Sequence, residues 1–287
     1  MKKLWKGMFM PPHLWESIYM AHRAGYDGCG AMILPRGGKG PLHELLAEPG
    51  LWSRVQTALD ETGLFLDGIG NCIIDDPANV HPYGMGMSPE PDDLRDYFEF
   101  AGKHELRSEE LGGVQTSVWT TNQDLAVERF DHLCAVCGEY GLTVNLEFVA
   151  WGICDDLQKA KDLLKMVGRS NARITLDIMH LYYSSVTPEE IAACPPELFG
   201  EFHLCDVPHI TFPDGHRELA AEGRSYRLWP GESGLDLTKW LEVIPDTAVI
   251  MPEIPNQDRN ALYGQFEYNC RTLEECKRYY RAHGISL

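Results

Sequence analysis

The amino-acid sequence predicts an α/β protein that forms a single (β/α)8 barrel over residues 1–287. The main observation is alternation: eight short apolar runs recur along the chain, and a longer segment of helical periodicity follows each of them. The length agrees, because barrels of roughly 250 residues commonly fold as one unit. A doubly wound sheet is the alternative, and it is disfavoured because no G-x-G-x-x-G sequence follows the first predicted strand.

The elements follow one another in strand–helix pairs. Apolar runs predict strands over residues 4–10, 25–33, 64–69, 114–119, 143–149, 174–178, 200–205 and 248–254. Amphipathic segments predict helices over residues 14–24, 42–62, 91–103, 125–140, 157–167, 188–193, 237–243 and 266–282. The boundaries carry typical residues, with Pro188 at a first helical position after Thr187 and with Gly63, Gly141 and Gly284 where helices end.

The charge of the chain excludes two classes of partner. Twenty-five Lys and Arg residues stand against 43 Asp and Glu residues, so the net charge is -18. Basic residues are scattered, and no stretch of them compensates for this excess. We therefore expect binding neither to nucleic acid nor to anionic membranes, and most of the negative charge is explained by solubility.

The cellular compartment is predicted from two features: the sequence has no segment that resembles a signal peptide or a membrane span, and it has many cysteines. The N-terminal segment is basic but has no apolar run long enough for a signal peptide, and no run is long enough to span a bilayer. Nine cysteines without a secretion signal indicate reduced thiols in a cytoplasm. The Cys134–Cys137 pair lies in a predicted helix without a second pair at zinc-finger spacing, so we expect small buried side chains there.

Two predicted connections are much longer than usual. They cover residues 75–90 and 208–234, and both follow a strand and precede a helix. Both therefore belong on the rim of the barrel that carries active sites, where long loops form lids over small substrates. For the first loop a decorative or dimer-forming role is an equal alternative, so a homo-oligomer stays open.

Ionisable residues end four consecutive predicted strands. They are Glu147, Asp177, His203 and Glu253. Because the carboxyl ends of barrel strands meet at one rim, these side chains are expected to converge, and three uncompensated carboxylates would repel one another strongly. A divalent cation resolves that conflict. Oxygen and nitrogen donors suit Mn²⁺, which we expect, or Mg²⁺, Co²⁺ or Zn²⁺, whereas a structural zinc site is disfavoured because no thiolate takes part. His180 lies just past the strand and is expected to support the ligands or to bind substrate.

At these positions the sequence resembles the xylose isomerase-like, sugar phosphate isomerase/epimerase superfamily over nearly its whole length. The segments that carry the resemblance are Glu147-Phe148, Leu176-Asp177-Ile178-Met179-His180, His203-Leu204-Cys205-Asp206, Pro230-Gly231-Glu232 and Pro252-Glu253. The resemblance implies that Glu147, Asp177, His203 and Glu253 bind one divalent metal. It also implies that His180 binds a substrate oxygen.

Residues 222–232 resemble the loop before the seventh helix in one branch of this family, where an Arg and a Pro-Gly-Glu turn shape the pocket. Arg224 and Arg227 are the matching candidates for substrate binding. Two departures stand out: Ser233 replaces a second Gly of the turn and is expected to stiffen it, and His203 stands where relatives often carry Gln, which also binds metals.

The predicted site suits proton transfer next to a carbonyl group. Chelation of a hydroxy-ketone would polarise its C=O and acidify the adjacent C–H, and two carboxylates would move the proton. The resemblance gives Glu147 and Glu253 both roles, ligand and acid/base. We therefore predict an isomerase or epimerase that acts on a keto-sugar or related polyol ketone through a metal-bound enediolate, in which Arg224 or Arg227 neutralises the enediolate or binds a carboxylate or phosphate.

The alternative is a metal-dependent lyase, dehydratase or decarboxylase for a keto-sugar, keto-inositol or dehydroshikimate-like substrate, since the same enediolate leads to these products. Trp119, Trp151 and Phe9 lie at or after strand ends and are expected to wall an apolar side of a sugar, although core packing suits Phe9 equally. In every case the expected partner is a small carbohydrate.

Three other members of this fold group are disfavoured. Endonuclease IV needs additional histidines and a basic groove, whereas the third predicted strand here ends at residues 68–72 without a histidine. True xylose isomerases use a second metal for a hydride shift. Asp206 and Asp214 are the candidate ligands for such a metal here, but their spacing does not support a second site. A barrel kept only for binding would have lost metal ligands, and all four are present.

Overall fold

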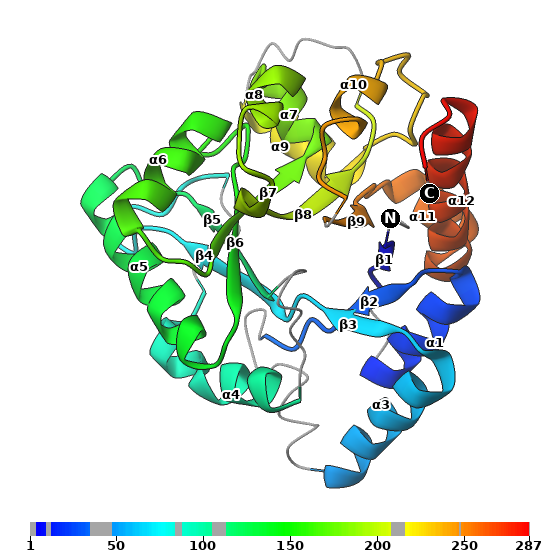
Figure 1. Ribbon diagram of the computed structural model, residues 1–287, viewed down its shortest axis with the longest axis horizontal. Helices are drawn as coiled ribbons and strands as arrows, with labels where there is room; N and C mark the ends of the chain where they lie inside the picture. Colours follow the sequence, from blue (N-terminus) through cyan, green and yellow to red (C-terminus); the bar gives the residue numbers. More distant parts are fainter. Residues whose placement is uncertain are drawn as a thin grey trace.

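The computed structural model describes residues 4–9, 13–34, 48–83, 88–104, 113–207, 216–246 and 248–286. Its strands form a ring of parallel neighbours, seen end-on in Figure 1. They are β1 (Lys6–Gly7), β2 (Gly28–Gly30), β3 (Phe65–Asp67), β4 (Gly70–Ile74), β5 (Gly113–Val118), β6 (Thr143–Glu147), β7 (Ala172–Asp177), β8 (Phe199–Leu204) and β9 (Val249–Pro252).

The ring has eight positions because β3 and β4 share one of them. β3 pairs with β2, and β4 pairs with β5, both in parallel. Between them Gly68 and Gly70 adopt φ angles of 72° and 133°, which only glycine adopts readily, so the chain kinks and then resumes pairing. A parallel bridge between Trp5 and Ile250 joins the first and last positions. The predicted (β/α)8 barrel is confirmed.

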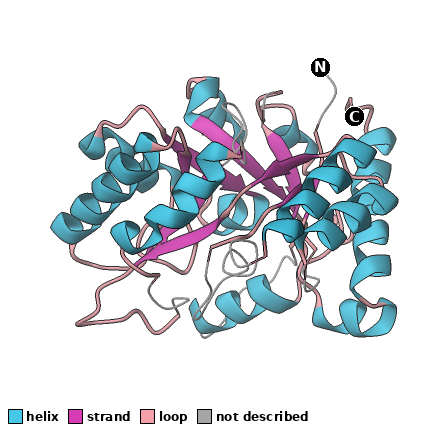
Figure 2. Ribbon diagram, turned by 90° about the horizontal axis from the view of Figure 1, so that it is seen from below, coloured by secondary structure: helices cyan, strands magenta, loops and turns pink. Residues whose placement is uncertain are grey.

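Helices surround this ring, as the views in Figures 1 and 2 show. They are α1 (Leu14–Ala24), α3 (Pro49–Thr62), α4 (Arg95–Lys103), α5 (Gln123–Glu139), α6 (Leu157–Val167), α7 (Ile178–Tyr183), α8 (Pro188–Ala192), α9 (His216–Ser225), α10 (Thr238–Leu241), α11 (Gln257–Tyr263) and α12 (Gln265–Ala282), with 3-10 turns at Pro91–Leu94 and Pro196–Leu198. Thr187 closes a capping box on α8, with Pro188 at its first position as predicted. No helix in the described ranges is long and apolar enough to cross a membrane.

The core lies between the strands and the outer helices. Trp5, directly before β1, packs edge-on against Tyr280 of α12, with 5.2 Å between ring centroids, and both side chains are almost fully buried. Every cysteine is a free thiol, and Cys134 and Cys137 are buried in α5, which confirms their predicted packing role. The burial raises the pKa of the Cys134 thiol to about 12, so this pair is inert at neutral pH.

Several predicted boundaries were wrong. The third strand does not end at residues 68–72, because the glycines that suggest a turn are the kink, and β4 continues to Ile74. The 208–234 connection is not an uninterrupted loop, since α9 occupies His216–Ser225. Residues 42–47 of a predicted helix, 84–87 and 208–215 of the predicted rim loops, and Asp214 lie outside the described residues. The single-domain organisation stays a prediction.

Candidate metal centre

The four predicted ligands come together at one rim of the barrel. Glu147 and Asp177 are the last residues of β6 and β7, His203 lies near the end of β8, and Glu253 follows β9 directly. Asp177 is in register with His203, so neighbouring strands present them side by side. Ligand atoms of Glu147, Asp177, His203 and Glu253 all lie within 4.8 Å of one another.

His203 is the centre of this cluster. Its Nδ1 atom lies 3.0 Å from Glu147 Oε1 and 3.2 Å from Glu253 Oε2. Burial lowers the pKa of His203, but the negative charge of Glu253 and the neighbouring carboxylates outweighs burial and raises it well above its usual value. The protein without a cation thus holds an imidazolium among the acids, and a cation that binds Nδ1 must displace this proton.

Asp177 is buried and ionised. Its Oδ1 atom accepts a hydrogen bond of 2.7 Å from the backbone N–H of Met179, which caps the short helix α7. Its Oδ2 atom lies 2.7 Å from Nη1 of Arg227. Burial acts to raise the pKa of Asp177, but the Arg227 guanidinium outweighs it and holds this pKa well below its usual range. The carboxylate is therefore ready to act as a ligand.

Arg227 lies among the ligand carboxylates. Besides Asp177, its Nη1 atom contacts Glu253 Oε2 at 3.0 Å and donates to the Glu253 carbonyl oxygen at 3.1 Å. Its backbone N–H donates to Pro255 and its carbonyl accepts from Asn256 Nδ2, so the residue is held from both sides. The structure thus brings Arg227 to the site, where it balances two ligands; its predicted role in substrate binding stays a prediction.

His180 and Trp151 form one wall beside the cluster. The backbone N–H of Ala150 donates to His180 Nδ1 at 3.3 Å, so Nε2 carries the proton of the neutral ring. Burial lowers the pKa of His180, which keeps the ring neutral. The Trp151 ring lies 4.9 Å from it, and the indole N–H of Trp151 is buried without a hydrogen-bond partner in the described part of the chain.

The other two predicted substrate-binding residues occupy different places. Arg224 is partly exposed; its guanidinium carbon lies 5.9 Å from the centre of the Trp151 ring, and it donates to the carbonyl oxygen of Tyr83. Trp119 is buried after β5, and its indole N–H donates to Ser117 Oγ at 2.8 Å. Arg224 thus reaches the Trp151 ring beside the cluster, whereas the N–H group of Trp119 is already used inside the protein.

The carboxylate of Asp206 anchors the Pro-Gly-Glu turn through hydrogen bonds. It accepts from the backbone N–H groups of Gly231 and Ser233, each at 3.0 Å, and from Ser233 Oγ at 2.6 Å. Glu232 of the same turn pairs with Arg259 at 2.8 Å. The hydroxyl of Ser233 therefore adds a tie that glycine lacks, and these contacts occupy the carboxylate that a second metal would need.

Sequence reasoning missed a second set of charges, which lies inside the barrel beneath the rim. Lys6 contacts Glu201 and pairs with Asp67 at 3.2 Å, and Glu201 approaches His203 Nε2 at 3.5 Å. All three side chains are at most 4% exposed. The available signal was alternation: Glu201 stands two residues before His203 in one strand, so both point to the same side.

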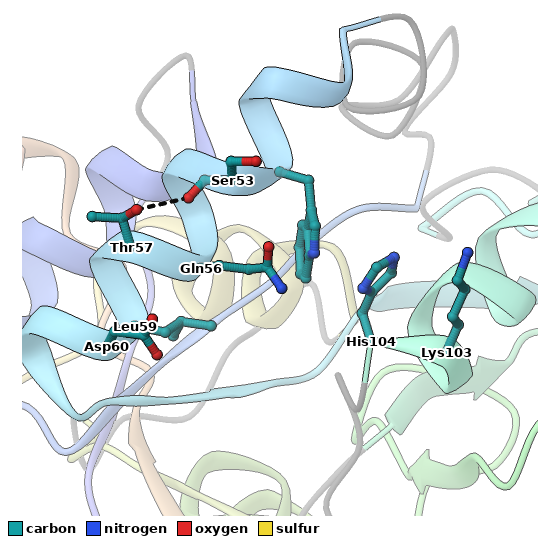
Figure 3. Close-up of a pocket in the computed structure, with 8 residues that line it drawn as sticks. Ser53, Gln56, Thr57, Leu59, Asp60, Lys103 and His104 are labelled. Atoms are coloured by element: carbon teal, nitrogen blue, oxygen red, sulfur yellow. Dashed lines mark hydrogen bonds between the residues drawn. The ribbon is translucent and has the colours of Figure 1, made fainter.

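Two cavities differ in their relation to this site. One of about 330 Å³ adjoins the cluster, and its lining includes Met8, Met251, Glu253 and Tyr268. The other, of about 630 Å³, is an outer groove lined by Ser53, Gln56 and neighbours on α3 and by Lys103 and His104 at the end of α4 (Figure 3). None of the cluster residues lines the outer groove, so the first cavity is the candidate for a substrate.

The donor set fits a divalent cation. Three carboxylates and one imidazole supply oxygen and nitrogen atoms of the type that such cations prefer in open sites. Glu253 Oε2 is buried without a hydrogen bond in the described residues, although it lies near two positive groups. The described residues thus offer one candidate metal site at the rim of a (β/α)8 barrel.

Comparison with known proteins gives the family. The model of the xylose isomerase-like TIM barrel family matches residues 18–276, and the chain belongs to this family. It is similar to inosose isomerases of Bacillus velezensis and Bacillus licheniformis, with 26% identity over 123 residues in each case. These matches cover 42% of this chain and 41% and 42% of the two relatives, respectively, so they span about two-fifths of each protein.

Solved structures agree with the fold over nearly the whole chain. The IOLI protein with a bound zinc atom has a TM-score of 0.70 at 14% identity and covers 97% of this chain and 99% of its own. D-allulose 3-epimerase from Methylomonas sp. in complex with D-allulose has a TM-score of 0.63 at 15% identity, with 98% of both chains covered. The 3-keto-D-glucoside 4-epimerase YcjR from E. coli has a TM-score of 0.65 at 14% identity, with 96% and 100% covered.

Proposed function

We propose that the chain is a divalent-metal-dependent isomerase or epimerase that acts on a keto-sugar or a related polyol ketone through an enediolate. The observation that carries this proposal is the convergence of three carboxylates and one imidazole at the rim of the barrel. The names of its relatives and structural neighbours support the substrate class, since they include inosose isomerases and epimerases of keto-sugars.

Glu147, Asp177, His203 and Glu253 would hold the cation. The cation would polarise a substrate carbonyl and acidify the neighbouring C–H group. Mn²⁺ is our first choice because the donors are mainly carboxylate oxygens, and Mg²⁺, Co²⁺ and Zn²⁺ are the alternatives. The zinc atom bound by the similar IOLI structure supports a divalent cation without selecting which one.

Glu147 and Glu253 would move the proton. They end β6 and β9, with β7 and β8 between them, so they reach a bound substrate from different sides. Their side chains are 18% and 34% exposed, which leaves both accessible from the rim. Burial acts to raise the pKa of Glu253, but the charges of Arg227 and His203 outweigh it and the pKa is lowered, so Glu253 is ionised and has no proton to lose before it accepts one, although the lowered pKa makes it a weaker base. Glu147 would return a proton to the opposite face or to the neighbouring carbon.

The surrounding residues would bind the rest of the sugar. His180 presents its Nε2–H group as a donor for a substrate oxygen, because Nδ1 is occupied by Ala150. Trp151 and Trp119 would cover an apolar face of the sugar. Arg224 would approach a negatively charged group from the rim. The cavity beside Glu253, about 330 Å³, lies within the usual size range of small-molecule sites.

Isotope exchange tests this proposal. The protein is stripped of metal, reloaded with Mn²⁺ and incubated in D₂O with a panel of ketoses, keto-inositols and 3-keto sugars. We expect deuterium at a carbon next to the carbonyl of at least one compound, without any other change in its composition, and no exchange after metal removal. Loss of water, CO₂ or an aglycone would assign the site to a lyase or decarboxylase instead. Exchange that persists without metal would contradict the proposed mechanism.

A further inference from the structure

The buried charges beneath the rim lie against the back of a proposed metal ligand. His203 directs Nδ1 toward Glu147 and Glu253, whereas its Nε2 atom lies 3.5 Å from Glu201 Oε1. Glu201 in turn contacts Lys6, and Lys6 pairs with Asp67 at 3.2 Å. The result is a chain of contacts that runs from the rim into the sealed interior of the barrel.

The two nitrogens of His203 have different requirements. A cation on Nδ1 leaves the proton on Nε2, and this proton needs an acceptor. Among the described residues, two side chains approach Nε2: the carboxylate of Glu201, at 3.5 Å, and the amide nitrogen of Gln115, at 3.3 Å. The amide nitrogen is a donor and also donates to Thr175 Oγ1, which leaves Glu201 Oε1, buried without a hydrogen bond in the described residues, as the acceptor available to this proton.

The interior is shaped around Lys6. A Cβ atom on Gly68 would lie 3.2 Å from Lys6 Nζ, so glycine at the kink between β3 and β4 leaves room for the ammonium group. Glu201 of β8 lines the same small interior cavity as Lys6 and Gly68. Burying two acids and one base at this depth costs several kcal/mol per ion, and apolar residues in their place would often be more favourable. Stability alone therefore gives no reason for this set of charges.

We propose that Glu201 is a positioning residue that fixes the orientation of His203 for the cation, and that Lys6 holds Glu201 in place. This inference rests on the proposed metal centre and adds three interior residues to it: Glu201, Lys6 and Asp67. Of these, Asp67 is the furthest from His203 along the chain of contacts. Glu201 acts on the cation only through His203, so its removal should weaken cation binding without removing a ligand. Loss of such supporting partners typically weakens metal binding by about 10–100-fold.

Cobalt titration of the full-length protein tests the inference, because Co²⁺ affinity and its visible absorption bands report on the ligands without any turnover. We expect Glu201→Gln to weaken Co²⁺ binding by about 10–100-fold and to change the absorption bands. Lys6→Met should act in the same direction by a smaller factor. The double variant Lys6→Met/Glu201→Gln should bind Co²⁺ within about twofold of Glu201→Gln, since Lys6 acts through Glu201.

Matched controls separate positioning from stability. Gln115→Leu removes the other contact to His203 Nε2 and should change Co²⁺ affinity by less than about threefold. If Glu201→Gln unfolds the protein because Lys6 loses one of its two carboxylate partners, the triple variant Lys6→Met/Asp67→Asn/Glu201→Gln removes the whole set of charges and gives the same measurement. A lower Tm with unchanged Co²⁺ affinity and spectrum, or a larger effect of Gln115→Leu, would overturn the inference. Wild-type protein that binds no Co²⁺ would instead overturn the proposed metal centre, and the inference with it.

Discussion

The rim of the barrel and the layer directly beneath it both gather charged side chains on inward-facing positions, but they balance their charges differently. At the rim, three carboxylates face Arg227 and His203, and two of them are 18% and 34% exposed. In the lower layer, Asp67 and Glu201 enclose Lys6, and no side chain is more than 4% exposed. The lower layer is therefore closed to ligands, whereas the rim has an excess of accessible negative charge that a cation would balance.

The largest expected effect concerns the accessible acids of the rim. Glu253→Gln and Glu147→Gln each keep the shape of the side chain but lose its ability to take a proton and weaken it as a ligand. We expect turnover of any substrate found by isotope exchange to fall by about 10²–10⁴-fold in each variant.

Steady-state kinetics at saturating Mn²⁺ measures this loss. Glu139→Gln is the matched control, because Glu139 is an exposed acid at the end of α5 that pairs with Arg95, and its turnover should stay unchanged. Full activity in both rim variants would contradict the proposed roles of Glu147 and Glu253, because these accessible acids would then matter no more than an acid sealed in the interior.

The next effect concerns Arg227, which balances two carboxylates of the rim. Arg227→Met leaves Asp177 buried without its partner, and breaking a buried pair costs about 3–5 kcal/mol. Urea unfolding in EDTA measures this loss. In saturating Mn²⁺ most of it should be recovered, because the cation supplies the positive charge and binding stabilises the folded state. A loss of the same size with and without Mn²⁺ would mean that Arg227 does not share its partners with a cation.

Much of the rim, but little of the lower layer, could be predicted from the sequence. Glu147, Asp177 and Glu253 each follow an apolar run directly, and the parallel fold brings such strand ends together whatever the details of packing. The placement of Arg227 depends on bridges from its segment to Asp206 and Asn256, which no local pattern specifies.

Lys6 and Glu201 depend on closure of the ring. They meet only because the first and last strands join at Trp5 and Ile250, almost a full chain length apart. The kink at Gly68 and Gly70 concealed the continuation of one strand, since positive φ angles at glycine are more typical of turns. Local signals therefore predicted that Glu147, Asp177 and Glu253 lie where strands end, whereas contacts between distant strands placed Lys6 and Glu201.

A smaller effect tests the sealed layer through its pH dependence. Burial raises the pKa of Asp67 to about 6, although Lys6 acts in the opposite direction, whereas an unfolded aspartate titrates near 3.8. A raised pKa in the folded state stabilises the protein below about pH 4, and this contribution is lost as the pH rises through about 6. The shift corresponds to at most about 3 kcal/mol.

Urea unfolding between pH 4 and pH 7.5 measures this contribution as the difference between wild type and Asp67→Asn. We expect the wild type to lose up to about 3 kcal/mol relative to the variant over this interval. The two proteins should have equal Co²⁺ affinity within a few-fold, because Asp67 is three contacts away from His203, with Lys6 and Glu201 between them. If the free energies of unfolding of the two proteins change in parallel with pH, the pKa of Asp67 is not raised in the folded protein.

The smallest effect concerns Asp206, an acid at the level of the rim. Like the acids of the lower layer, its carboxylate is paired with groups of the protein and needs no cation. It accepts from the backbone N–H groups of Val207, Gly231 and Ser233 and from Ser233 Oγ. Ser233→Gly removes the hydroxyl donor, and we expect a loss of about 1.5 kcal/mol in the free energy of unfolding, with unchanged affinity and stoichiometry of Co²⁺. If Asp206 instead belonged to a cation site, releasing it from Ser233 would increase the number of Co²⁺ ions bound. Unchanged stoichiometry would thus place Asp206 with the structural acids and restrict the cation to the cluster around His203.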